Sequence, residues 1–291
     1  MKQQRILRIG SRDSHLAVRQ TTIVMDALQA AYPNWNLELV TMKTTGDKIL
    51  DRRLDQIGGK GLFVKELDAA LLEGRVDLTV HSMKDLPMET NPELPIAALF
   101  RRGNPRDCLV LREGCSEVSV IGTSSARRQV QLSRLYPNAI VESVRGNIHT
   151  RLKKLDDGQF SALILAAAGL ERAGLTHRIS RYFSPEEMIP AAGQGVLAVQ
   201  CRKDFPIELL QPIHHRETFL AVTAERSFVQ ALEGGCSSPV AAYGMVQDEE
   251  LRLIGQYVSP EGEIHTGSIT GAAEDGEQLG IQLAKQLKEG D

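Results

Sequence analysis

The stretch VSVIGTSSARRQVQL, residues 118–132, decides the fold class of this chain. A short apolar strand ends at Gly122, a turn rich in hydroxyl groups follows, and apolar residues then recur at helical spacing. The same order of strand, arginine-bearing turn and helix occurs at residues 7–28 and 140–152. Strands that alternate with helices are typical of doubly wound α/β sheets, so we expect this class.

The residues around these three turns predict where the helices begin. Ser14, Ser124 and Asn147 each precede a helical pattern, and Ser and Asn are preferred N-cap residues. Further segments carry strand or helix periodicity. They are strands at 37–42, 76–82, 162–168, 251–258 and 263–269, a turn at 259–262, and helices at 61–72 and 274–287. The run 162–168 is apolar on both faces, as in a parallel strand covered by helices.

Size and charge limit the function. The 291 residues are enough for two or three domains, with compositional breaks near residues 100, 190 and 217. The net charge of -3 gives no overall basic field, so we expect no nucleic-acid partner. The N-terminal segment is charged and no apolar run is long enough to cross a bilayer, which indicates a cytoplasmic protein without a membrane partner. The cysteines and histidines lack metal-ligand spacing, so we expect no metal.

Several arginines lie where helix physics disfavours them. Arg127 and Arg128 fall in a first helical turn, and Arg12 and Arg151 lie beside others, although helix N-termini carry partial positive charge. A set of such positions points to an anionic ligand with several carboxylates at the carboxyl ends of the strands. For any single arginine, pairing with a surface acid is the better interpretation.

One acid and one thiol are candidates for chemistry. Asp85 follows a strand, and Pro87 keeps Leu86 out of a helix, so Asp85 should lie in an exposed turn. Near arginines its carboxylate should stay ionised and stabilise a developing cation, although capping its own turn fits at least as well. His81 fits a satisfied core histidine equally. Cys236 follows paired glycines that end a helix, which fits a nucleophile or attachment point, or simply a small apolar side chain.

At this point the residues resemble one family. RIGSRDS, GGKGLFVKEL, VHSMKDLP, GTSSARRQ, VRGNIHTRL, ILAAAGLERAGL, AAGQGVLAV and EGGCSSP occur in the order seen in porphobilinogen deaminases (hydroxymethylbilane synthases). The resemblance covers nearly the whole chain. It implies two doubly wound domains like type II periplasmic binding proteins and a small C-terminal α+β domain. The implied boundaries are 1–100 with 195–214, 101–194, and 215–291.

The resemblance also implies the chemistry. A dipyrromethane cofactor is held by a thioether to Cys236, four porphobilinogen units are added with loss of ammonia, and hydrolysis releases the linear tetrapyrrole hydroxymethylbilane. Asp85 matches the catalytic aspartate, and a monomer is implied. The residues that match the cofactor- and substrate-binding positions are Arg12, Ser14, Lys60, Lys84, Thr123, Ser124, Ser125, Arg127, Arg128, Arg145, Arg151 and Gln194.

The sequence departs from the family pattern at Gln56, where many members have a lysine, at GGCSSP and at AAGQG. None of these changes removes a group that the mechanism needs. The runner-up function is a non-catalytic, two-lobed cytoplasmic protein that binds a carboxylated ligand and needs neither Asp85 nor Cys236. A third is a cysteine-nucleophile transferase that acts on another carboxylated substrate.

Overall fold

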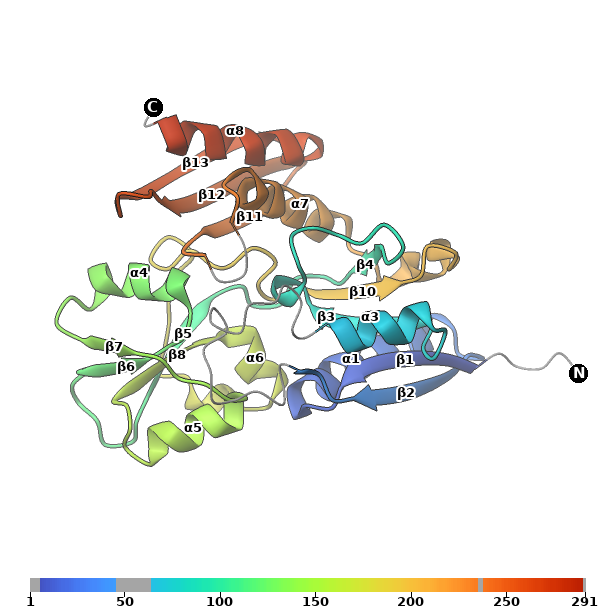
Figure 1. Ribbon diagram of the computed structural model, residues 1–291, viewed down its shortest axis with the longest axis horizontal. Helices are drawn as coiled ribbons and strands as arrows, with labels where there is room; N and C mark the ends of the chain where they lie inside the picture. Colours follow the sequence, from blue (N-terminus) through green and yellow to red (C-terminus); the bar gives the residue numbers. More distant parts are fainter. Residues whose placement is uncertain (1–5, 46–63, 235–237, 290–291) are drawn as a thin grey trace, which may run out of the picture. The chain divides into compact units, whose positions relative to one another are not determined.

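The computed structural model describes residues 6–45, 64–234 and 238–289 (Figure 1). The chain forms two compact units, each built from separate stretches of sequence. Unit 1 contains Met1–Arg102 and Val196–Phe219, and unit 2 contains Gly103–Gly195 and Leu220–Asp291. The described residues form three sheets, one in unit 1 and two in unit 2. The division into three domains with the boundaries given above stays a prediction.

The sheet of unit 1 has the order β2-β1-β3-β10-β4. Its strands are β1 (Ile6–Arg12), β2 (Asn36–Met42), β3 (Leu78–Ser82), β4 (Ile96–Leu99) and β10 (Leu197–Cys201). β1 is parallel to β2 and β3, whereas β10 is antiparallel to both of its neighbours. The chain therefore returns from unit 2 as an interior strand of this sheet, between β3 and β4.

Helices cover both faces of this sheet because successive side chains of a strand point to opposite sides. Ile9 packs with Val24 and Leu28 of α1 (His15–Ala31). Gly10 faces Leu67 of α3 (Lys65–Leu72). The 3-10 segment Ile207–Ile213 follows β10 and also packs into the α1 side of the core. The predicted doubly wound architecture is confirmed for this sheet.

The first sheet of unit 2 has the order β7-β6-β8-β5-β9. Its strands are β5 (Asp107–Leu111), β6 (Val120–Gly122), β7 (Ile140–Glu142), β8 (Ala162–Ala166) and β9 (Arg181–Tyr182). β6 is parallel to β7 and β8, and β5 is antiparallel to β8 and β9. Figure 1 shows α4 (Ala126–Leu135) and α5 (Ile148–Asp156) on opposite faces of this sheet. α6 (Ala167–Arg172) follows β8 directly.

The second sheet of unit 2 is antiparallel, with the order β11-β12-β13. β11 (Ala241–Gln247), β12 (Glu250–Val258) and β13 (Ile264–Ala272) are covered on one face by α7 (Arg216–Ala231) and α8 (Gly276–Glu289). Gly255 lies under the Phe228 ring of α7, and Gly267 lies under Leu287 of α8. The predicted α+β tail is confirmed, including the 259–262 turn, which Gly262 closes by donating to Ser259 O at 2.9 Å.

Two sequence expectations were wrong in detail. The strand expected at 162–168 ends at Ala166, because Ala167 and Ala168 open α6; both segments are buried, and apolarity does not separate them. The N-cap of α4 is Ser125, which accepts from Arg128 N at 3.5 Å. Ser124 instead donates to Val144 O at 2.7 Å, which joins the turn after β6 to the turn after β7. Ser14 and Asn147 cap α1 and α5 as predicted.

Candidate functional site

The carboxyl edge of the unit 1 sheet carries three of the predicted site residues, Arg12, Lys84 and Asp85. Arg12 ends β1, and Lys84 and Asp85 lie in the 3-10 turn Met83–Asp85 that follows β3. Because β1 and β3 are parallel neighbours, their ends meet at the same edge, where ligands bind in open α/β sheets. Arg12 and Lys84 are half-buried and Asp85 is exposed. Ser14 lies at the same edge, where it caps α1 through Ala17 N at 3.3 Å.

The backbone of the Asp85 turn is held from within unit 1. Met83 N donates to Val196 O at 3.0 Å, and Leu86 N donates to Met83 O at 3.2 Å. Leu86 is extended, with ψ 140°, as the following proline requires. Within the described part of the chain, the Asp85 carboxylate makes no hydrogen bond to its own turn. The capping interpretation is therefore not what holds this turn.

The histidine before this turn is a core residue. His81 is 6% exposed, and its Nε2 lies 3.0 Å from Thr79 Oγ1. Burial, with a contribution from the positive charge of Arg12, lowers the pKa of His81 to about 3. The ring is therefore neutral at physiological pH, and the interpretation as a satisfied core histidine is confirmed. His81 therefore adds no positive charge to this edge.

A buried glutamine, which the sequence analysis did not single out, supports the same turn. Gln20 of α1 is 5% exposed and donates through Nε2 to Ser82 Oγ at 3.0 Å. Ser82 is the last residue of β3, immediately before the turn that carries Asp85. A polar residue on the apolar face of α1 was the available signal in the sequence.

The carboxyl edge of β6, β7 and β8 in unit 2 carries the second set of predicted residues. Thr123, Ser124 and Ser125 form the turn after β6. Arg145 follows β7, and Arg151 lies in the first turns of α5. Both arginines are half-buried, and Arg151 Nε donates to Gly146 O at 2.8 Å. Parallel strands bring these turns to one edge, as the sequence predicts.

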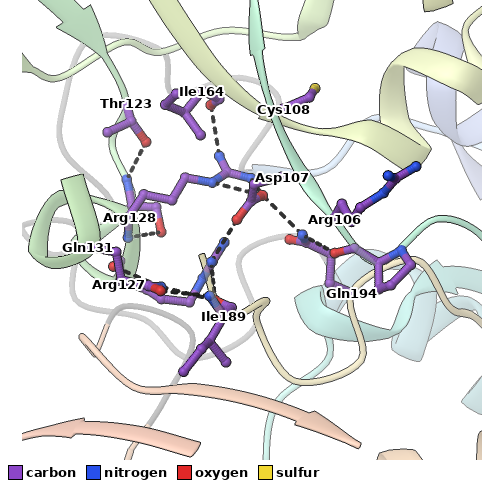
Figure 2. Close-up of polar contacts among 12 residues, drawn as sticks. Arg106, Asp107, Cys108, Thr123, Arg127, Arg128, Gln131, Ile164, Ile189 and Gln194 are labelled. Carbon is purple, nitrogen blue, oxygen red and sulfur yellow. Dashed lines mark hydrogen bonds and ion pairs between the residues drawn. The ribbon is translucent and has the colours of Figure 1, made fainter. Parts of the chain in front are cut away.

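The guanidinium groups of Arg127 and Arg128 are buried and make their polar contacts within unit 2 (Figure 2). Arg128 Nε and Nη2 donate to Asp107 Oδ1 at 3.2 and 2.7 Å, and its Nη1 donates to Ile164 O at 3.0 Å. Arg127 Nη1 lies 2.7 Å from Asp107 Oδ2 and donates to Ile189 O at 2.6 Å. The sequence predicts a ligand anion beside these arginines. In the structure, the carboxylate of Asp107 lies beside both of them. Direct contact of either arginine with a ligand stays a prediction.

Gln194 joins the same cluster. It is 1% exposed, and its Nε2 donates to Pro105 O at 2.7 Å and to Asp107 Oδ1 at 3.0 Å (Figure 2). Asp107 itself is fully buried. Burial alone would raise the pKa of Asp107, but the positive charges and hydrogen bonds of Arg127 and Arg128 outweigh it and hold the pKa below its usual range. Asp107 is therefore ionised.

A second buried acid, also missed in the sequence, holds the turn before Gln194. Glu225 of α7 is fully buried, and its carboxylate accepts from Gly193 N and from Gly244 N, both at 2.7 Å. These bonds join α7, β11 and the AAGQG turn within unit 2. A glutamate among the apolar residues of α7 was the signal that the sequence offered.

The thiols differ in reactivity. Burial raises the pKa of Cys108 to about 12 and that of Cys201 to about 11, so both are unreactive apolar side chains. Cys115 is half-buried and donates to Glu117 O at 3.1 Å. Cys236, Lys60 and Gln56 lie outside the described residues.

The described ranges hold neither a metal-binding cluster nor a membrane-spanning helix. Among these residues, no three His, Cys, Asp or Glu side chains lie together in a way that could hold a metal ion. No helix in these ranges is long and apolar enough to cross a membrane.

Comparisons with known proteins cover almost the full chain. A family model described as "Porphobilinogen deaminase, dipyromethane cofactor binding domain" matches residues 7–206, and one described as "Porphobilinogen deaminase, C-terminal domain" matches residues 219–289. The porphobilinogen deaminase of Acetivibrio thermocellus is 53% identical over 287 residues, which is 98% of each chain. That of Alkaliphilus oremlandii is 54% identical over 97% of this chain and 96% of the relative.

Solved structures give weaker likenesses. The BenM effector binding domain with its effector benzoate is 15% identical, with a TM-score of 0.42, over 72% of this chain and 90% of that chain. The periplasmic aliphatic sulphonate binding protein SsuA from Escherichia coli is 11% identical, with a TM-score of 0.42, over 78% and 70%. The fold class therefore rests on the strand order and helix placement described above.

Proposed function

The chain belongs to the porphobilinogen deaminase family, and on that premise we propose which of its residues perform the reaction. The activity is that of a hydroxymethylbilane synthase, a transferase of tetrapyrrole biosynthesis that works with a dipyrromethane cofactor. The observation that carries the residue assignment is the exposed Asp85 carboxylate beside Lys84 and Arg12, at the carboxyl edge of the unit 1 sheet.

The basic side chains at each of the two sheet edges fit carboxylate groups of a ligand. Four of these side chains are half-buried: Arg12 and Lys84 in unit 1, and Arg145 and Arg151 in unit 2. Half-buried guanidinium and ammonium groups bind carboxylates more strongly than exposed ones, since water screens them less. We assign Lys60 to the same role on the basis of the sequence, and the hydroxyls of Ser14, Thr123 and Ser125 as additional donors. Ser124, also predicted to bind, already donates its hydroxyl hydrogen to Val144 O, so its side chain would serve there as an acceptor. Once bound, the dipyrromethane would supply the free pyrrole carbon to which the first new unit is joined.

Asp85 is the catalytic group in this proposal. Its carboxylate is exposed and makes no hydrogen bond to its own turn, so it is available to the pyrrole N–H groups of porphobilinogen. A fixed negative charge stabilises the positive charge that develops as ammonia departs. His81 cannot take part as a cation, because burial keeps its pKa at about 3.

Cys236 is the proposed attachment point for the cofactor. The low reactivity of Cys108 and Cys201 supports this choice, because burial raises the pKa of both thiols. We further propose that the protein acts as a cytoplasmic monomer on free porphobilinogen.

Intact mass of the purified holoenzyme tests the attachment. We expect an added mass of two pyrrole units on the wild type, its absence in Cys236→Ser, and its retention in Cys115→Ser, the control for loss of another accessible thiol. An unmodified wild type that binds carboxylated ligands without turnover would instead favour the non-catalytic binding protein.

Asp85→Asn tests the catalytic assignment. The amide has the same size but no charge, so we expect native thermal unfolding and loss of most turnover. Asp13→Asn removes an exposed acid just beyond the end of β1, the neighbour of β3, and should keep activity. Near-normal turnover in Asp85→Asn would refute the assignment.

A further inference from the structure

Asp107 connects the predicted binding residues of unit 2, although no binding motif contains it. It is the first residue of β5 and lies opposite Ala166, the last residue of β8. Because β5 and β8 are antiparallel, Asp107 lies at the carboxyl edge of β8, the edge at which the turn after β6 also lies. Its position in the sheet is therefore that of a site residue.

The two carboxylate oxygens contact three side chains from two segments. Oδ1 accepts from Arg128 and from Gln194 Nε2, and Oδ2 pairs with Arg127 Nη1. Figure 2 shows the three side chains converging on this one carboxylate. Arg127 and Arg128 belong to the first turn of α4, and Gln194 is in the turn where the chain leaves unit 2. This carboxylate thus links the α4 turn to the AAGQG turn, in addition to the hydrogen bonds that Arg127 and Gln131 make with Ile189.

Charge balance argues that this cluster is more than a structural ion pair. A single ionised carboxylate faces two guanidinium groups, and all three side chains are at least nine-tenths buried. The cluster therefore keeps one net positive charge at an edge where carboxylate ligands are expected. For stability alone, an equal number of opposite charges or an apolar cluster would serve better, because burying an unbalanced charge is costly.

We propose that Asp107 is a positioning residue of the binding site: it orients Arg127, Arg128 and Gln194 so that the unit 2 edge receives carboxylate groups of the oligopyrrole. The inference rests on the proposed function and extends it to a residue that does not itself touch the substrate. Loss of the Asp107 charge removes the charged acceptor that Arg128 and Gln194 share, so both side chains can shift, although the chain keeps every residue predicted to bind the ligand.

The test compares Asp107→Asn with the wild-type holoenzyme. We expect KM for porphobilinogen to rise about 10- to 100-fold, as displacement of binding groups by about 1 Å produces, with a smaller change in kcat. The distribution of enzyme-bound intermediates, measured by intact mass, should shift toward shorter chains. Asp157→Asn is the matched control, because Asp157 pairs with Lys153 at 2.8 Å on the exposed side of α5.

The outcomes separate positioning from stability. A folded Asp107→Asn variant with KM and intermediates like those of Asp157→Asn would overturn the proposal. If Asp107→Asn does not fold, Asp107→Glu decides, since it keeps the charge but moves it by one methylene. For a folded Asp107→Glu variant we expect kcat/KM to fall at least tenfold. Wild-type kinetics in Asp107→Glu, or failure of both variants to fold, would overturn the positioning role. Absence of turnover in the wild type would refute the proposed function instead.

Discussion

Replacement of Glu225 by glutamine should lower the free energy of unfolding strongly, although it exchanges only one carboxylate oxygen for an NH2 group. Both carboxylate oxygens accept backbone N–H groups at 2.7 Å, from Gly193 and Gly244, at a fully buried position. An amide offers only one acceptor oxygen, so its NH2 group must face one of these N–H donors. The variant loses one charge-assisted hydrogen bond and leaves a buried donor without its acceptor.

The magnitude follows from these two losses. A hydrogen bond to a charged group contributes about 1.5–3 kcal/mol, and an unsatisfied buried polar group costs about 1–3 kcal/mol. Because the two terms overlap, we expect Glu225→Gln to lower the free energy of unfolding by about 2–4 kcal/mol. For 291 residues, an unfolding entropy of about 2.1 cal/mol/K per residue converts this loss to a fall in Tm of roughly 3–7 °C.

Thermal unfolding followed by circular dichroism is the assay. Glu263→Gln is the matched control: Glu263 is exposed and lies 3.8 Å from His265, so its replacement should leave Tm nearly unchanged. A Glu225→Gln variant whose Tm equals that of Glu263→Gln would refute the argument. It would mean that the joint between α7, β11 and the AAGQG turn does not depend on this carboxylate.

Three further predictions concern packing, pH and binding. Gly280→Ala should cost about 1–3 kcal/mol of stability, because a Cβ there would collide with Ala224 O and lie 2.8 Å from Phe228 N; an unchanged Tm would contradict this close approach of α7 and α8. The pKa of His81 is depressed to about 3 in the folded state, so its contribution is fully present above about pH 6.5 and is lost as pH falls toward 3, at about 1.4 kcal/mol per pH unit. The acid-side loss of stability, measured as Tm against pH, should therefore be shallower in His81→Gln than in the wild type, and equal slopes would contradict the prediction. Arg151→Leu should stall cofactor assembly or chain growth, visible as a changed ladder of enzyme-bound intermediates; an unchanged ladder would count against its binding role.

Local features of the fold could be predicted because they depend on residues only a few positions apart. Ser14 and Asn147 cap their helices as expected, since an N-cap needs only its own side chain and the amide three residues on. The 259–262 turn joins β12 and β13 for the same reason. The sequence predicts Ser124 as the N-cap of α4, but Ser125 is the cap. Ser124 donates to Val144 O instead, and a contact with a residue 20 positions away cannot be read from the local sequence.

The sequence predicts several residues of the candidate site, but not the buried acids that hold its turns. Motif order identified Asp85, Lys84 and Arg12, and their meeting at one edge follows from parallel neighbours β1 and β3. Asp107 and Glu225 were missed, because neither belongs to a turn with a recognisable pattern. Their roles come from partners far away in sequence, such as Gln194 for Asp107 and Gly193 for Glu225.

The sequence by itself determined the alternation of strands and helices, the arginine-bearing turns, and the family. Only the tertiary structure decided that Arg127 and Arg128 have an internal counter-ion in Asp107. The physical reason is that hydrophobic periodicity and capping depend on neighbours within a helical turn, whereas the charge that faces a buried guanidinium depends on which strands become adjacent. In this protein β5 lies beside β8, and that adjacency brings Asp107 to the same edge as Arg127 and Arg128.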